Sequence, residues 1–457
     1  MENSQPRGEK RPTEPPRKRA GITTFTASAI AVADMVGIGV FTSLGFQVAD
    51  ITSAFSVILL WVVGGVVALC GALSYAELAA ALPRSGGEYH FLSRIYHPAV
   101  GFMAGWLSAT VGFAAPIAIA AIAFGAYFDG VLPGVASPLW LGLIAAWAIA
   151  LVHLSGLRQG TRFHNISTIF KILFIVCFII AGFAYGTPQD ISFAPSAVDL
   201  THISAAPFFI GLVFVMYSYS GWNASVYIID EVQDPQRSVP RSLLIATLIV
   251  LVLYVGLNAL FLYTTPMDKM AGQVEVALVA GRHIFGETGG DIVGALICFG
   301  LIATISAMTW IGPRVTKVMG EDLPLLGVFA RQTRNGVPAA AIALQTVIVT
   351  VLILTQSFEK VVNYIQFAIT LSSFLAVLGV MVLRYRRPDL PRPVRTWGYP
   401  VTPVIFLLVT GFMMAYLLAE RPVESLAGLA TLLAGLAVYA FSPKRKPGAS
   451  QGVSVGE

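Results

Sequence analysis

The sequence predicts an all-α membrane protein that crosses the bilayer many times. Hydrophobic residues make up 56% of the 457 residues and charged residues only 12%, whereas about a quarter of the residues of a soluble protein are charged. The chain divides into long apolar stretches, and two of these stretches are interrupted near the middle by glycine and small polar residues. Composition and stretch length indicate the class, and the two interruptions predict where a ligand binds.

Twelve apolar stretches are long enough to be membrane-spanning helices, for which about 20 residues suffice. They occupy residues 22–48, 53–82, 100–128, 139–155, 163–184, 205–229, 243–264, 292–319, 338–354, 361–383, 401–419 and 426–441. We expect residues 21–441 to form a single membrane domain, and residues 1–20 and 442–457 to be disordered tails.

Basic residues gather on one side of this predicted bundle. With the N-terminus on the inside, 24 of the 29 Lys and Arg residues fall on that side, four fall on the opposite side, and Lys171 lies within a stretch. Because Lys and Arg near span ends favour the cytoplasm, we expect both termini to be cytoplasmic and the protein to lie in the cell membrane. The net charge of +5 then follows from topology, so no nucleic-acid partner is expected.

The first stretch is interrupted at Gly37-Ile38-Gly39, within DMVGIGVFTSLG. Glycine weakens a helix by up to about 1 kcal/mol per residue, and irregular backbone at membrane depth survives only where it lines a cavity. The free amides of the second half-helix suit a carboxylate, and the carbonyls of the first half suit an ammonium group or a small cation. This interruption is therefore expected to form one wall of a binding site.

The sixth stretch is interrupted at residues 217–223, YSYSGWN, which place two serines, a glycine and Asn223 at mid-membrane. One serine could bond back to its own helix, but the whole run indicates a second break, and Asn223 is a candidate for contact with the ligand. The two breaks lie five stretches apart, which predicts two five-helix repeats, residues 22–184 and 205–383, with the second inverted in the membrane. Residues 401–441 would add two helices outside the repeats.

Two ionisable residues lie within the apolar stretches. An unpaired Lys171 would cost at least about 2.5 kcal/mol, so it either extends to the cytoplasmic interface or faces the interior in place of a cation. Asp34 precedes Gly37 by about one helical turn, so both can face the same side. Three interpretations of Asp34 are open: a counter-charge for Lys171, a site for an ammonium group or a proton, and a position in water near the cytoplasmic mouth.

A glycine-rich turn follows the second stretch on the predicted cytoplasmic side. It places two carboxylates, Glu77 and Glu88, near Arg84 and Arg94. Ion pairs at a membrane interface are common and contribute little, so this turn is interpreted either as a structural clasp or as a gate.

Two other regions are candidates for parts of the site. Residues 267–287 form the longest outer loop and are predicted to contain a short helix at 274–285, which is either a lid or a connector. Residues 309–314 and 361–367, at the ends of the eighth and tenth stretches, are candidates for the half of the pocket that contacts the ligand's side chain.

Four motifs make the sequence similar to the amino acid, polyamine and organocation superfamily of permeases, and within it to the L-type exchangers and their bacterial relatives. The motifs are VGIGVF in the first stretch, YAELAAALPRSGGEY after the second, SGWNASVYIIDEVQDPQRSVPRSL across the sixth and RRPDLPRPVRTWGYP before the eleventh. The resemblance covers most of the chain. It implies the leucine-transporter fold, with a 5+5 inverted repeat, two extra helices and discontinuous helices one and six.

The resemblance also implies roles for single residues. The amides expected to hold the carboxylate of an amino acid are those of Gly37, Ile38 and Gly39. The carbonyls expected to receive its ammonium group are those of Tyr217, Ser218 and Ser220, with Val36 nearby. Tyr217 would be the aromatic gate of the pocket, and Lys171 would occupy the place of the second sodium ion of sodium-driven relatives.

Two departures from the family pattern matter. The first break contains Gly-Ile-Gly where the family has Gly-Ser-Gly, so a serine hydroxyl contact to the carboxylate is missing. The outer loop after the third stretch has no cysteine with which to join a heavy subunit, as animal L-type members do. We therefore expect no disulfide-linked heavy subunit.

These observations predict a secondary active, sodium-independent transporter that exchanges neutral L-amino acids by alternating access. Two alternatives are a proton-coupled symporter and an antiporter of cationic amino acids or polyamines. Alternatives of a different class are a membrane substrate sensor and a pore, although a pore should show a polar ring or filter loop. No enzyme, metal or cofactor is expected, because the six histidines form no metal spacing and no nucleophile constellation.

Overall fold

A computed structural model describes residues 21–156, 161–333, 335–355 and 357–442. The predicted disorder of residues 1–20 and 443–457 lies outside the described residues. In chain order the elements are α1 (Thr24–Met35), α2 (Gly39–Gln47), α3 (Ala54–Ala81), α4 (Gly87–Ile95), α5 (Pro98–Leu107), the π-helix η1 (Ser108–Gly112), α6 (Ala114–Val131), α7 (Pro138–Leu154), α8 (Thr161–Tyr185), α9 (Ala197–Ser204), α10 (Ala206–Tyr219), the 3-10 helix η2 (Ala224–Glu231), α11 (Pro235–Thr264), α12 (Met267–Met270), α13 (Val276–Asp322), the 3-10 helix η3 (Pro324–Leu326), α14 (Gly327–Ala330), α15 (Ala339–Leu354), α16 (Phe358–Arg386), α17 (Val401–Glu420) and α18 (Pro422–Phe441).

The described helices fit a polytopic membrane protein. Nine helical segments in this part of the chain are long and apolar enough to span a bilayer, and a tenth consists of α9 and the α10–η2 segment, bent by 70°. Two shorter apolar helices, α7 and α15, coincide with the fourth and ninth predicted stretches. Each of the twelve stretches thus corresponds to an apolar helical segment, and the count of twelve crossings stays a prediction.

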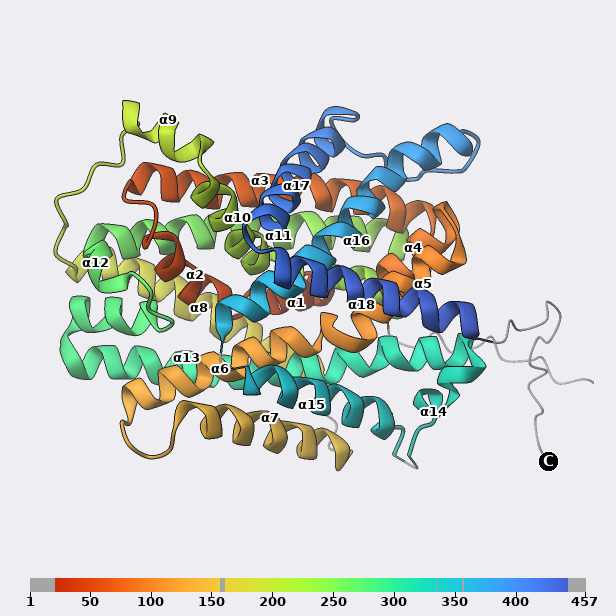
Figure 1. Ribbon diagram of the computed structural model, residues 1–457, viewed down its shortest axis with the longest axis horizontal. Helices are drawn as coiled ribbons and strands as arrows, with labels where there is room; N and C mark the ends of the chain where they lie inside the picture. Colours follow the sequence, from red (N-terminus) through yellow and green to blue (C-terminus); the bar gives the residue numbers. More distant parts are fainter. Residues whose placement is uncertain (1–20, 157–160, 334, 356, 443–457) are drawn as a thin grey trace, which may run out of the picture.

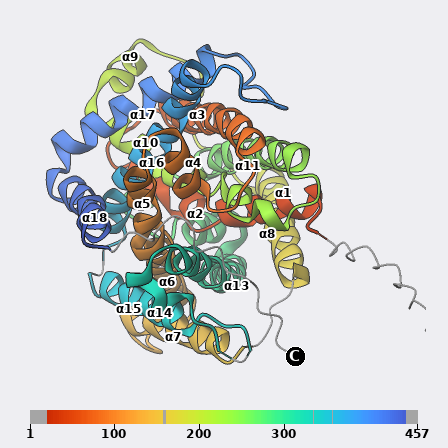
Figure 2. The ribbon, with the colours of Figure 1, turned by 90° about the vertical axis from the view of Figure 1, so that its right-hand side faces the viewer.

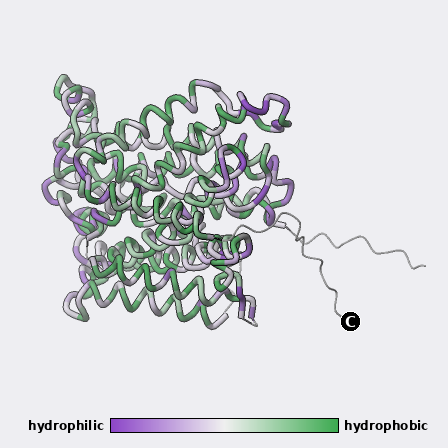
Figure 3. The backbone as a smooth tube through the Cα atoms, turned by 45° about the vertical axis from the view of Figure 1, so that its right-hand side comes forward, coloured by the Kyte–Doolittle hydropathy of each residue, from purple (hydrophilic) through white to green (hydrophobic). Residues whose placement is uncertain are grey.

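The long helices lie side by side along one axis, with α9 and α12 at one end of the bundle and α4 and α14 at the other (Figure 1). Hydrophobic residues follow the helices along their length, and hydrophilic residues gather at the two ends (Figure 3). The outer helix α7 exposes Trp140, Ile144, Trp147 and Leu151. A band of exposed apolar side chains between two polar ends is the surface that a protein presents to lipid.

Corresponding helices of the two predicted repeats pack together. Helix α3 packs along α11, and α6 packs along α13. In the view along the bundle, α2 lies inside, while α7, α15, α17 and α18 lie at the periphery (Figure 2). The interrupted helices are therefore shielded from lipid by the uninterrupted ones, which lets irregular backbone persist at this depth.

The predicted clasp at Glu77 has other partners than the sequence suggested. Its carboxylate accepts hydrogen bonds from Arg384 Nε at 2.9 Å and Nη2 at 2.5 Å, and from the Thr396 amide at 2.7 Å. Arg392 Nε lies 3.3 Å away. The cationic partners come from the end of α16 and the segment after it, so Glu77 fastens α3 to a part of the chain that is remote in sequence.

Candidate functional site

The first interruption separates α1 from α2. Helix α1 ends at Met35, and α2 begins at Gly39, so Val36, Gly37 and Ile38 lie between the two half-helices. The Gly37 amide donates to the Met35 carbonyl at 2.7 Å. The amides of Ile38 and Gly39 lie at the N-terminal end of α2, where the first N–H groups have no acceptor within the helix. Two of the three amides expected to hold a carboxylate thus remain for a ligand.

The second interruption follows α10. Helix α10 ends at Tyr219, Ser220 is extended with φ −59° and ψ 150°, and Gly221 has φ +96°, which favours glycine. The 3-10 helix η2 then begins at Ala224. The Ser220 amide and hydroxyl both donate to the Tyr217 carbonyl, at 3.0 and 2.6 Å. The Tyr217 carbonyl is therefore already occupied.

The two interruptions touch each other at two glycines. A Cβ atom on Gly39 would lie 2.5 Å from Ser218 Oγ and 2.8 Å from Ser218 Cα. A Cβ atom on Gly221 would lie 2.8 Å from Asp34 Oδ2. Only glycine permits either approach, because real Cβ contacts are longer than 3.0 Å. The two breaks, which the sequence predicts separately, are therefore in direct contact in the structure.

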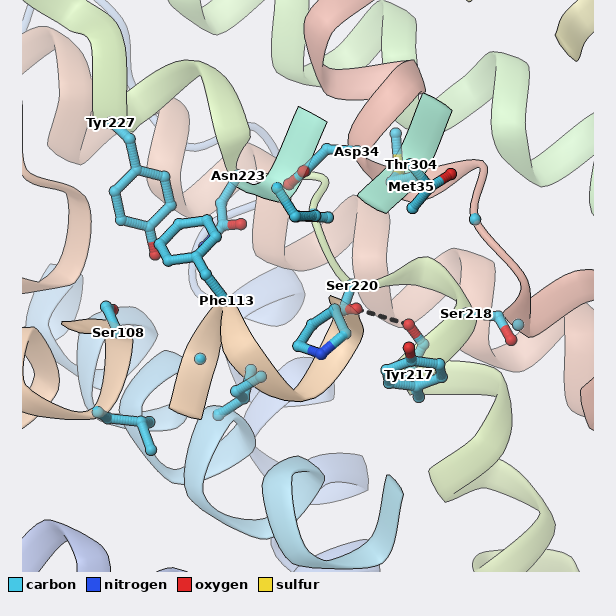
Figure 4. A pocket seen from close by; sticks show the side chains of 18 of the residues that line it. Asp34, Met35, Ser108, Phe113, Tyr217, Ser218, Ser220, Asn223, Tyr227 and Thr304 are labelled. Carbon is cyan, nitrogen blue, oxygen red and sulfur yellow. Dashed lines mark hydrogen bonds between the residues drawn. The ribbon is translucent and has the colours of Figure 1, made fainter. Parts of the chain in front are cut away.

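A cavity of about 90 Å³ lies where the breaks meet. One water molecule needs about 10–15 Å³, so the cavity has room for a small solute. Figure 4 shows it between Asp34, Asn223 and the pair Tyr217 and Ser218. Eight of the predicted site residues line it: Asp34, Gly37, Ile38, Gly39, Tyr217, Ser218, Ser220 and Asn223.

The rest of the cavity wall is mainly apolar. It comes from the third, eighth and tenth predicted stretches, through Leu107, Phe113, Met308 and Ile369. The ranges 309–314 and 361–367, chosen from sequence, do not line it. Thr309, for example, is buried and donates to the Ile305 carbonyl of its own helix at 2.7 Å. The two ranges therefore lie on helices that contribute to the central cavity but on other turns, and most of residues 309–314 line the second cavity instead.

Lys171 and Val36 lie behind the first interruption rather than on the central cavity. The Lys171 side chain is 6% exposed. Its Nζ donates to the Val36 carbonyl at 2.9 Å and to Thr304 Oγ1 at 2.7 Å. Lys171 therefore faces the interior and does not extend to the interface. The Val36 carbonyl, predicted to lie near an ammonium group, receives this lysine.

Asp34 lines the central cavity and is not paired with Lys171 among the described residues. Asp34 Oδ1 is buried and has no hydrogen-bond partner, and the hydrogen bonds of Lys171 go to Val36 and Thr304. No direct contact supports the counter-charge interpretation, but the two side chains interact electrostatically, so this interpretation stays a prediction. A buried carboxylate oxygen beside a cavity can accept a hydrogen bond from a ligand's ammonium group or bind a proton.

Glu88 was not predicted from the sequence to line the cavity. It is 5% exposed and lies in the first turn of α4. Its carboxylate accepts hydrogen bonds from Asn223 Nδ2 at 2.6 Å, from the Tyr75 hydroxyl at 2.8 Å and from the Tyr227 hydroxyl. Glu88 therefore holds the segment after the second interruption. The sequence had assigned it to the clasp at the cytoplasmic turn.

Aromatic rings pack together beside the central cavity, near the end of α2. The Phe46 ring stacks on the rings of Phe214 and Phe358, with centroids 5.1 and 5.6 Å apart. Tyr217 meets Phe358 edge-on at 6.5 Å. Toward the end that holds α4 and α14, Tyr227 also lines a second cavity of about 530 Å³. The bundle is thus hollowed toward the end that holds α4 and α14, and aromatic rings pack together on the other side of Tyr217.

The outer loop packs against the end of α2, and its role as a lid or a connector stays a prediction. The short helix predicted at 274–285 is the first part of α13, which bends at Gly286, where φ is +75°. The Gly272 amide donates to the Gly45 carbonyl at 2.9 Å, so the loop contacts the end of α2.

Within the described residues, no three His, Cys, Asp or Glu side chains are grouped as a metal site requires.

Comparisons with known proteins give one consistent result. The model of the family described as "Amino acid permease" matches residues 22–438. The chain is 26% identical to the b(0,+)-type amino acid transporter 1 of Mus musculus over 446 residues, 96% of this chain and 90% of that protein. It is 25% identical to the large neutral amino acids transporter small subunit 2 of Homo sapiens over 434 residues, 93% of this chain and 80% of that protein.

Proposed function

We propose that this chain, which belongs to the amino acid permease family, exchanges neutral L-amino acids across the cell membrane by alternating access, without sodium. Family membership makes it an amino acid transporter and a multi-pass membrane protein rather than an enzyme, and the family implies the leucine-transporter fold. The proposal adds the substrate class, the exchange mode, and the twelve crossings in two inverted repeats.

One observation supports the proposal above the others: a cavity lies where two interrupted helices touch. On one side, the amides of Ile38 and Gly39 lie at the positive end of α2, which suits a carboxylate. On the other side, Asp34 Oδ1 lacks a partner and can accept a hydrogen bond from the ammonium group. The two charged ends of an amino acid would therefore find complementary groups across the cavity.

The apolar wall would select the side chain. Leu107, Phe113, Met308 and Ile369 suit an uncharged substrate. The names of two relatives, a b(0,+)-type transporter and a large neutral amino acids transporter, also favour amino acids of this class. Lys171 would supply a fixed positive charge at the Val36 carbonyl, where a sodium-driven carrier binds an ion.

The larger cavity at one end and the packed aromatic rings near the end of α2 support alternating access. If the end with α4 and α14 is cytoplasmic, as the distribution of basic residues predicts, the structure faces inward. The aromatic rings around Phe46 would then separate to open the opposite side. We also propose that the transporter works without a disulfide-linked heavy subunit, because the loop after α6 has no cysteine.

The charges on the cavity favour a second candidate function. Two carboxylates, Asp34 and Glu88, line the cavity, and none of the residues that line it in the described chain is Lys, Arg or His. A cationic amino acid or a polyamine would be drawn to such a site. Proton-coupled symport is also consistent with Asp34, which could bind a proton in one half of the cycle. A sensor or a pore is not supported by any feature of the cavity.

Uptake into proteoliposomes tests these functions together. Vesicles with and without unlabelled internal amino acids would receive a panel of labelled substrates, with sodium and pH gradients set independently. We expect uptake of neutral amino acids that requires internal amino acid and ignores sodium. Uptake into empty vesicles that is driven by a pH gradient would indicate symport. A preference for lysine or diamines would indicate the second candidate function. No uptake of any substrate would contradict transport of amino acids.

A further inference from the structure

Tyr254 of α11 is the one tyrosine in the described chain whose hydroxyl bonds to both interrupted helices. Its side chain is 0% exposed. Its hydroxyl lies 2.6 Å from the Met35 carbonyl, at the end of α1, and 3.1 Å from the Ser218 carbonyl, near the end of α10. We propose that Tyr254 is a positioning residue that sets the geometry of the ammonium site. This inference rests on the proposed function.

The two carbonyls would repel each other without a donor between them. Each belongs to the C-terminal end of a half-helix, which has a partial negative charge. An unsatisfied carbonyl at membrane depth costs several kcal/mol, because lipid offers no hydrogen bond. Transporters built from broken helices use such ends to bind cations. Here the Tyr254 hydroxyl lies within hydrogen-bond distance of both carbonyls, which share the partial positive charge of its one proton.

The Tyr254 ring, carried by the continuous helix α11, packs against the continuous helix α3 and against the last residue of α10. Trp61 of α3 packs edge-on against the Tyr254 ring at 5.7 Å and 90°, and Tyr219 packs against it at 5.1 Å. The carbonyl of Tyr254 accepts a hydrogen bond from Asn258 Nδ2 at 2.8 Å within α11. Because α3 and α11 are continuous helices, they provide a rigid reference point for the two broken ones.

The position of the hydroxyl matters for binding because both of its acceptors belong to residues of the cavity wall. Met35 and Ser218 line the central cavity beside Asp34. If the ends of α1 and α10 moved apart, the distance from Asp34 to the amides at the start of α2 would change. Tyr254 therefore acts on the substrate through Met35 and Ser218 and does not itself line the cavity.

The test compares Tyr254→Phe with Tyr219→Phe. Tyr219 is the matched control, because it is also fully buried and its hydroxyl also donates to a backbone carbonyl, that of Trp61 at 3.1 Å. Each variant keeps its ring and loses one buried hydroxyl. Only the hydroxyl of Tyr254 contacts the interruptions. Melting temperature, apparent KM and maximal exchange rate would be measured for the wild type and both variants.

We expect similar melting temperatures for the two variants and an apparent KM about tenfold higher for Tyr254→Phe alone, as for one lost hydrogen bond to a buried acceptor. The maximal rate should change less than the KM. A second measurement uses the carboxylic acid that corresponds to the best substrate without its amino group. Its inhibition constant should be the same in all three proteins, because the ammonium site is the part that is disturbed.

Other results would overturn the inference. Equal KM values in the two variants would show that the hydroxyl does not set the site. Equal losses of affinity for the amino acid and for the acid without an amino group would indicate a general distortion. A Tyr254→Phe protein that fails to fold beside a folded Tyr219→Phe protein would assign the hydroxyl to stability. The wild-type protein separates these results from failure of the proposed function. If the proposed function is wrong, the wild type itself shows no exchange.

Discussion

The two interruptions of the bundle are held in different ways. At the first, continuous helices donate to the backbone: Lys171 of α8 bonds to the Val36 carbonyl, and Tyr254 of α11 bonds to the Met35 carbonyl. At the second, side chains beyond the break donate to an acceptor, because Asn223 and Tyr227 bond to Glu88 of α4. The first break is thus held through its carbonyls, and the second through its side chains in addition to the bond from Tyr254 to the Ser218 carbonyl.

This difference predicts which of the two breaks tolerates amino-acid substitutions better. At the first break Lys171 donates to the Val36 carbonyl, so its loss leaves a buried acceptor unsatisfied, whereas the Met35 carbonyl keeps the Gly37 amide as a donor. The carboxylate at the second break accepts three hydrogen bonds and lies at the boundary with the larger cavity, through Tyr227. We expect larger effects from changes at the first interruption than from changes at the second.

Replacing Lys171 with Ala should produce the largest effect. The change removes the donor to the Val36 carbonyl and to Thr304 Oγ1, and hydrogen bonds to charged groups contribute about 1.5–3 kcal/mol each. Exchange should fall by about a hundredfold or become dependent on an added cation. Counterflow in proteoliposomes at several pH values, with and without sodium, measures this. The exposed Lys269→Ala is the control, and unaltered exchange by Lys171→Ala at every pH would contradict a role in transport.

The two glycines of the first interruption should differ sharply. Gly39→Ala would place a Cβ atom 2.8 Å from the backbone of Ser218, whereas Gly37→Ala would meet Thr304 Cγ2 at 3.7 Å, an ordinary contact. Overpacking costs about 1–3 kcal/mol, so Gly39→Ala should lose about tenfold or more in exchange rate or affinity. Gly37→Ala is the matched control. Equal losses would mean that backbone freedom matters here, and not the close approach of the two breaks.

The interruptions themselves could be predicted from the sequence. Glycine and small polar residues in a long apolar run are costly unless they form a site, so Gly37 and Gly221 were visible as local signals. The bend at Gly286 and the π-helix η1 were not, because they depend on how α13 and α6 pack. The partners of Glu77 lie in residues 384–396, and no local pattern encodes a pair so far apart.

The sequence could predict those residues of the site that lie at the two interruptions. Asp34 and Asn223 fall at the interruptions and do line the cavity. Glu88 and Tyr254 come from other elements and were missed. A signal for Tyr254 existed, because a tyrosine in an apolar run needs a partner for its hydroxyl, yet the sequence does not name that partner. The resemblance supplied the position of Lys171 but not its bond to Thr304.

At the second interruption, Gly221→Ala tests whether conformation or contact limits function. Ala at φ +96° costs about 1–2 kcal/mol, and its Cβ would lie 2.8 Å from Asp34 Oδ2. Gly286→Ala is the control, because Gly286 has φ +75° and open space around it. Both variants should melt at lower temperature, and Gly221→Ala should melt lowest because its Cβ also meets Asp34. Only Gly221→Ala should lose exchange, by about tenfold, since only Gly221 contacts the residue proposed to bind ammonium.

Glu88→Gln should have the smallest effect and should sharpen the choice between the two substrate classes. Gln keeps the size of Glu and an acceptor oxygen for Tyr75 and Asn223, but its amide nitrogen, in the place of Oε2, cannot accept from Tyr227. We expect the KM for neutral amino acids to rise by about threefold to tenfold, from the loss of one of three hydrogen bonds. The exposed Glu420→Gln is the control.

The ratio of KM values for cationic and neutral substrates decides between the functions. If Glu88 serves only to hold Asn223 and Tyr227, as the exchange of neutral amino acids requires, Glu88→Gln raises both KM values by the same factor. If its charge attracts the substrate, the KM for lysine or a diamine rises further than the KM for a neutral amino acid. A selective loss would therefore favour the second candidate and would show that the carboxylate holding the second interruption also acts on the ligand.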